Sequence, residues 1–200
     1  MKKLIVLIIS FINFAYAGFY FSGGLGMTHN NDELFTSSTA HLNGGEAQYT
    51  GNINMGYQPV SNTAKGGSYF MDAGINFATG DNVIKSSNDS EVKTDLEVLL
   101  RFGSMFQASQ RTFPYLFIAG VYDMGVSMDG GALSTTTSKD IMGYGAGVGI
   151  RAFAGQNGFY DFSYLYHTAD EESLGTYSDG SSAKFTMARG VFTAAIGYMF

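Results

Sequence analysis

Three residues in the last quarter of the chain carry the side chains of a serine hydrolase. Asp161, Ser163 and His167 have the same parity, so they share one face if this segment is a strand. A nucleophile and its base must lie within hydrogen-bonding distance. Four residues of strand at ~3.3 Å each separate Ser163 from His167 by about 13 Å. We therefore expect no catalytic residues here and no enzyme.

The sequence gives no better support for a metal site, a phosphate loop or a nucleic-acid surface. His29, His41 and His167 are spread along the chain, which argues against a metal site. The glycine-rich run at 143–149 lacks the Lys-Ser/Thr pair of a phosphate loop, and we expect no cofactor. A net charge of −6 at pH 7 argues against a nucleic-acid partner.

The clearest pattern lies at the C-terminal end of the chain. Phe192, Ile196, Tyr198 and Phe200 recur at even spacing, and Arg189 lies on the opposite parity. A period of two is typical of a strand whose two faces meet different surroundings. An apolar face that runs to the last residue predicts a strand facing lipid in a closed barrel, because a bilayer leaves no backbone group unpaired.

The same alternation recurs along the chain. It covers eight segments: 18–28, 47–58, 68–78, 93–106, 114–128, 141–154, 159–168 and 184–200. The links are alternately long (29–45, 79–92, 129–140 and 169–183) and short (59–67, 107–113 and 155–158). Long extracellular loops and short periplasmic turns are typical of outer-membrane barrels. The sequence therefore predicts an all-β, eight-stranded antiparallel up-and-down transmembrane β-barrel.

The register of segment 114–128 is chosen from its polar residues. Placing Asp123 and Ser127 inside makes Tyr115, Phe117 and Val121 point inward as well. The residues then expected outside are Leu116, Ile118, Tyr122, Met124 and Val126.

A soluble eight-stranded barrel such as a lipocalin would share the alternation but point its apolar face inward. Three observations favour the membrane barrel instead. Charged residues make up 14% of the chain, against about 25% in soluble proteins. The polar face consists mostly of Gly, Ser, Thr, Asn and Gln, with almost no Lys. The apolar face is rich in Tyr and Phe, which can form interfacial girdles.

Residues 1–17 have the form of a secretory signal peptide. Lys2 and Lys3 precede an apolar run at 4–14, and residues 15–17 read Ala-Tyr-Ala, a small-x-small cleavage site. The run is shorter than the about 20 residues of a membrane-spanning helix. We therefore predict two parts, a signal peptide at 1–17 and a barrel domain at 18–200.

The charged residues of the predicted strands lie on the polar face, inside the barrel. An eight-stranded barrel has room only for side chains, and buried charges are costly unless they are paired. The predicted lumen charge network consists of Asp72, Asp95, Glu97, Arg101, Arg151, Asp161 and Arg189. We expect its arginines to bridge its acids, with the inward glycines of 141–154 making room. The network favours a plugged interior, and a narrow pore for small solutes or ions is the alternative.

These features together resemble the small outer-membrane β-barrels of Gram-negative bacteria, such as the OmpA transmembrane domain and OmpX. The resemblance implies a bacterial outer-membrane location, contact with its lipid, and a C-terminal signal read by the barrel-assembly machinery. On this chain the signal corresponds to Phe192, Ile196, Tyr198 and Phe200. Some small barrels are enzymes that modify lipids. A lipid-modifying enzyme is therefore a further alternative, behind the pore.

The four long loops are rich in Ser, Thr, Asn, Asp and Gly. Binding and recognition residues are concentrated on loops held by a rigid scaffold. We expect a monomer with a structural or adhesin-like role, in which these loops contact a host or surface ligand.

Overall fold

The computed structural model describes residues 18–35, 41–44, 47–59, 68–79, 82–84, 90–94, 96–130, 133–178 and 180–200. The predicted signal peptide, 1–17, and Asp95 of the predicted charge network lie outside these residues. Within the described ranges, no helix is long and apolar enough to cross a membrane.

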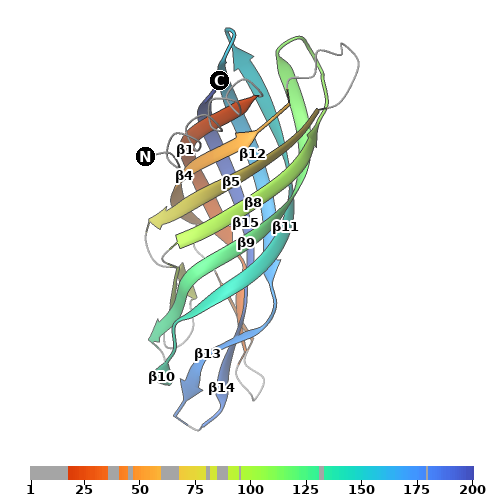
Figure 1. Ribbon diagram of the computed structural model, residues 1–200. Helices are drawn as coiled ribbons and strands as arrows, with labels where there is room; N and C mark the ends of the chain where they lie inside the picture. The colour runs from red at the N-terminus through yellow and green to blue at the C-terminus, as the bar shows by residue number, and fades with distance from the viewer. Residues whose placement is uncertain are drawn as a thin grey trace, which may run out of the picture.

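Eight long strands form a closed antiparallel barrel, and each pairs with the strands before and after it in the barrel (Figure 1). They are β1 (Phe19–Asn30), β4 (Ala47–Tyr57), β5 (Ser68–Thr79), β8 (Leu96–Met105), β9 (Thr112–Gly130), β11 (Lys139–Ala154), β12 (Gly158–Ala169) and β15 (Ala188–Met199). The first and last strands close the barrel, with Tyr20 opposite Met199 and Asn30 opposite Arg189. This confirms the predicted eight-stranded up-and-down barrel.

Side chains along the barrel strands alternate between the outer surface and the interior. In β12, Tyr160, Phe162 and Tyr164 are half-exposed, whereas Asp161 and Ser163 are buried. The other strands follow the same rule, so Phe, Tyr, Leu, Ile, Val and Met side chains form a belt around the outside. This orientation is that of a barrel in lipid, and it is the reverse of a lipocalin-like soluble barrel.

The predicted register of β9 is correct as far as Met124 and wrong from Val126 onward. Leu116, Ile118, Tyr122 and Met124 are exposed as expected, but Val126 is fully buried. The cause is a β-bulge next to Gly125, which has a φ of 67°, where two residues of β9 face one residue of β11. One extra residue in a strand moves the following side chains to the opposite face.

The carboxylate of Asp140 holds this bulge in place. It accepts hydrogen bonds from the backbone N–H of Gly125 at 3.0 Å and from the hydroxyl of Tyr122 at 2.8 Å. Both β9 and β11 are longer than the 9–11 residues that cross a bilayer. The bulge therefore marks the point where these strands leave the apolar belt.

Beyond the belt, the strands continue into a second β-structure, which we call the extension. Its strands are β2 (Asp32–Phe35), β3 (His41–Gly44), β6 (Asn82–Ile84), β7 (Ser90–Lys93), β10 (Leu133–Thr136), β13 (Glu172–Tyr177) and β14 (Ser182–Thr186). Five of them form a sheet in the order β10-β13-β14-β2-β3, and β7 pairs with β9. The extension lies at the opposite end of the molecule from the C-terminus (Figure 1).

The extension corrects the prediction that these long segments are polar loops. It has a core to which the ends of the barrel strands contribute, and in which Val92, Met128, Leu174 and Phe185 are at most 1% exposed. β14 ends at Thr186 and β15 begins at Ala188, with Met187 between them, so the predicted strand at 184–200 is two strands. These strands are too short, and too rich in Ser, Thr and Gly, to produce a long alternating pattern.

Candidate functional site in the barrel interior

The barrel is narrow, and its inward aromatic rings fit because glycines face them. A Cβ atom on Gly147 would lie 2.2 Å from Cζ of Phe117, and one on Gly149 would lie 2.2 Å from Cζ of Tyr115. Each glycine is paired directly with its ring residue across β9 and β11. Gly147 and Gly149 therefore make room for aromatic rings, and not for arginine side chains as the sequence suggests.

Two arginine–aspartate pairs lie deep in the barrel. Arg101 donates from Nε and Nη2 to the two carboxylate oxygens of Asp72, at 2.7 and 2.9 Å. Arg151 donates from Nε to Asp161 at 2.8 Å. In each pair the two residues lie directly opposite each other on neighbouring strands. All four side chains are buried, and one-to-one pairing offsets the cost of burying their charges.

Arg151 has further partners on every side. Its guanidinium carbon lies 4.2 Å from the ring centre of Tyr20 and 4.4 Å from that of Phe159, within the range of cation–π attraction. Its Nη1 donates to Oε1 of Gln58 at 2.9 Å. The Tyr20 hydroxyl donates to Asp72, which links the two ion pairs into one layer.

A second polar cluster lies nearer the extension. Nε2 of His167 is 3.4 Å from Oε2 of Glu97, and Nη1 of Arg189 is 3.3 Å from Oδ1 of Asp123. The amide of Asn76 donates to Glu97 at 2.6 Å. Ligand atoms of Glu97, Asp123 and His167 all lie within 4.8 Å of one another. The barrel thus concentrates two acids, an imidazole and a guanidinium in one buried layer.

Aliphatic side chains lie next to this cluster, on its side away from the extension. Leu99, Val121, Leu165 and Val191 are two residues further along the same four strands, and all are buried. The core of the extension lies on the other side. On these four strands the polar cluster therefore lies between apolar groups, whereas Gln48, Thr50 and Asn76 of β4 and β5 line the small cavity beside it.

Two small cavities lie beside these clusters. One cavity of about 20 Å³ is lined by residues including Thr50, Glu97 and Arg189. A second, also of about 20 Å³, is lined by residues including Asn54 and Arg101. A cavity of this size holds about one water molecule, so neither is a channel for solutes.

All described residues of the predicted charge network lie inside the barrel, but their pairing differs in part. Arg101 and Arg151 do bind predicted acids, whereas Arg189 binds Asp123, which the prediction did not assign to it. The contact of His167 with Glu97 is not among the predicted pairs. Parity places His167 inside with Asp161, but it does not indicate which acid lies opposite.

The hydrolase-like residues of β12 are not brought together. Asp161 binds Arg151, and His167 contacts Glu97, while Ser163 lies between them on the same buried face. The lipid-facing side of β12 carries tyrosines and Phe162 instead.

The residues of the predicted C-terminal assembly signal all face outward. Phe192, Ile196, Tyr198 and Phe200 are 48%, 65%, 51% and 55% exposed. The backbone N–H of Phe200 donates to the carbonyl of Phe19 at 2.9 Å, so the last residue is tied to the first strand.

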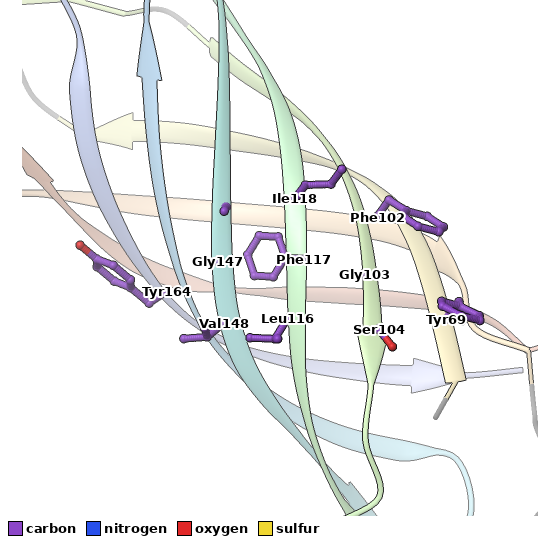
Figure 2. A pocket seen from close by; sticks show the side chains of 11 residues that line it. Tyr69, Phe102, Gly103, Ser104, Leu116, Phe117, Ile118, Gly147, Val148 and Tyr164 are labelled. Atoms are coloured by element: carbon purple, nitrogen blue, oxygen red, sulfur yellow. The ribbon is translucent and has the colours of Figure 1, made fainter. Parts of the chain in front are cut away.

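A shallow apolar groove of about 610 Å³ lies on the outer face of the barrel (Figure 2). Tyr69 and Phe102 lie on one side of it and Val148 and Tyr164 on the other, with Leu116 between them. Its lining is almost wholly apolar, and it is part of the belt that contacts lipid.

No protein-family model matches the chain, and no curated protein matches it in sequence. Solved structures do match over nearly the whole length. Neisserial surface protein A is 14% identical with a TM-score of 0.53, covering 91% of this chain and 97% of that one. Outer membrane protein AlkL, determined in lipid bilayers, is 15% identical with a TM-score of 0.51, covering 92% and 90%.

A third match is Ail, the attachment invasion locus protein of Yersinia pestis, in complex with the heparin analogue sucrose octasulfate. It is 13% identical with a TM-score of 0.50, and the match covers 92% of this chain and 99% of that one. At this level of identity the likeness is evidence of a shared fold alone. The chain thus has the fold of the small eight-stranded outer-membrane β-barrels, and its apolar belt is the surface that such a barrel presents to the lipid of the bacterial outer membrane.

Proposed function

We propose that this protein is a plugged, non-catalytic barrel that anchors an interaction surface, the extension, outside the outer membrane. The observation that carries the proposal is the filled interior. Paired charges, inward rings and aliphatic side chains occupy the barrel, and the described cavities within it are each about one water in size. A barrel of this kind serves as a rigid support.

The narrow-pore alternative would require several buried contacts to break together. A solute would have to displace the Arg101–Asp72 and Arg151–Asp161 pairs and then pass the apolar core of the extension. We expect the folded protein to give no regular conductance steps in planar lipid bilayers. Reproducible steps from protein whose folding has been verified by gel mobility would favour the pore instead.

The charge of the extension suggests which partners it would accept. Lys139 pairs with Glu172 at 3.1 Å and Lys184 with Glu171 at 2.6 Å, so these lysines are already neutralised. Ail was captured with a sulfated ligand, but an acidic chain with paired lysines suits a neutral or basic partner better. Sulfated glycans are therefore expected to bind weakly here.

The interaction role can be tested with a shortened extension. Replacing residues 174–183 by a short Gly/Ser hairpin removes most of β13 and leaves the barrel strands intact. Cells producing the full chain should attach to host-cell or matrix surfaces better than cells producing this variant at equal surface levels. Equal attachment would remove the adhesin-like role and leave a structural one.

The absence of catalysis is also a proposal. It is supported by the burial of Asp161, Ser163 and His167 inside the barrel, away from lipid. Mass spectra of lipid A from cells with and without the protein should be identical. A new or missing acyl chain would restore the lipid-modifying alternative.

A further inference from the structure

The polar cluster near the extension contains the donor set of a metal site. Glu97 on β8, Asp123 on β9 and His167 on β12 are at most 8% exposed, and their ligand atoms lie within 4.8 Å of one another. One imidazole and two carboxylates are ligands typical of Zn²⁺ and similar divalent ions. Because they come from three different strands, they converge only when the barrel has closed.

One distance within the cluster matches the spacing of two ligands on one metal ion. Charge-assisted hydrogen bonds are about 2.7–2.9 Å long, as in the deeper pair of Arg101 and Asp72 at 2.7 Å. Nε2 of His167 and Oε2 of Glu97 are 3.4 Å apart. Two ligand atoms, each about 2.1 Å from a tetrahedral ion, lie about 3.4 Å from each other.

The charges of the cluster also favour a cation. Each deeper arginine has one aspartate, whereas here the carboxylates of Glu97 and Asp123 lie close together and Arg189 binds Asp123. Two carboxylates buried side by side are costly unless positive charge lies beside them. A divalent ion bound between them would supply positive charge, and a water could fill a further coordination position.

Space for such a water is present beside the cluster. The cavity of about 20 Å³ that Glu97 and Arg189 line also has Thr50, Gln48 and Asn76 in its wall. A water there has polar groups on several sides, and of the three proposed ligands Glu97 lines the cavity.

We propose that Glu97, Asp123 and His167 bind one divalent transition-metal ion of the Zn²⁺ class inside the barrel. The ion joins β8, β9 and β12 beneath the extension and stabilises that end of the barrel. Its role is structural, because apolar groups lie on both sides of it and no substrate could reach it.

The test uses the mature chain without a polyhistidine tag, folded in detergent and stripped with a chelator. After incubation with Zn²⁺, Co²⁺ or Mn²⁺ and gel filtration, elemental analysis should find about one ion per chain. Co²⁺ should give the visible absorption of a low-coordinate site. His167→Gln and Glu97→Gln should weaken binding at least about tenfold, whereas His29→Gln, at an exposed histidine of β1, should not.

Several outcomes would overturn the site. One is folded wild-type protein that retains none of these ions. Another is His167→Gln binding as tightly as wild type, because the ion would then lie elsewhere. A third is wild type that binds no metal but loses stability as pH rises past the imidazole range, which would show that a proton on His167 supplies the positive charge.

If the variants fail to fold, wild-type protein labelled in its 3 histidines provides an independent measurement. Addition of Zn²⁺ should shift one set of ring signals in the NMR spectrum, and the other two sets should stay in place. No shift, or a shift assigned to His29 or His41, would contradict the proposal.

Discussion

Each buried charge in this barrel is stabilised by specific neighbours. The carboxylate of Asp161 accepts hydrogen bonds from Nε of Arg151 at 2.8 Å and from the hydroxyl of Tyr115 at 2.5 Å. Asp72 receives two donors of Arg101 and the hydroxyl of Tyr20. Removing one member leaves its partner as an uncompensated charge in a dry interior, which is the most damaging change available to such a pair.

Asp72→Ala should therefore cost about 3–5 kcal/mol of unfolding free energy, because it leaves Arg101 buried without a counterion. Urea unfolding in lipid vesicles measures this loss. The double variant Asp72→Leu with Arg101→Met should recover much of it, since both charges are gone. Lys184→Ala breaks an exposed pair with Glu171 and should cost less than about 1 kcal/mol. A similar cost for Asp72→Ala would mean that the interior is wet.

A second prediction at this scale concerns the glycines that face rings. Gly147→Ala places a Cβ atom 2.2 Å from the ring of Phe117 and should cost about 1–3 kcal/mol through overpacking. Gly120→Ala on the neighbouring strand is the control, because a Cβ there meets nothing within 4 Å. Combining Gly147→Ala with Phe117→Leu should restore part of the stability, and equal costs for the two glycines would contradict the packing argument.

At the scale of elements, the extension has a core separate from that of the barrel. Phe185 of β14 packs with Leu174 of β13 and Met187. Phe185→Ala should cost about 3–5 kcal/mol locally, which is enough to open the extension while the barrel stays folded. Trypsin should then cut at Lys184 faster, with no loss of the heat-modifiable band on gels. Ser182→Ala, exposed on the same strand, should leave the cleavage rate unchanged.

The barrel strands could be predicted from sequence because their alternation extends over ten or more residues. Val126 could not be placed, since its direction depends on the bulge at Gly125 and on Asp140, a residue of another strand. The Arg101–Asp72 ion pair could be predicted, because the two residues lie opposite each other on the neighbouring strands β8 and β5. Arg189–Asp123 joins β15 and β9, which are not neighbours, so it depends on the width and stagger of the closed barrel.

At the scale of the whole molecule, the C-terminal strand serves both the closed barrel and its predicted assembly. Phe200→Ser should lower the fraction of heat-modifiable protein in outer membranes several-fold, because it removes the aromatic end of the predicted assembly signal. Tyr160→Ser is the control, since Tyr160 is 50% exposed on the neighbouring strand and loses similar lipid contact. Equal losses for both variants would show that lipid contact, and not recognition, is responsible.

The contact of Tyr20 with Arg151 has a consequence for the lifetime of the folded state. Tyr20 is in the first strand of the barrel, and the guanidinium that lies over its ring belongs to Arg151 on β11, the sixth of the eight barrel strands. The contact joins strands that are far apart in the chain and so forms late, and opening the seam between β1 and β15 would expose a stacked, desolvated guanidinium. Such late-forming interactions slow unfolding more than they speed folding. Once the barrel has closed, a high kinetic barrier to unfolding is expected to give the folded protein a long lifetime in the membrane.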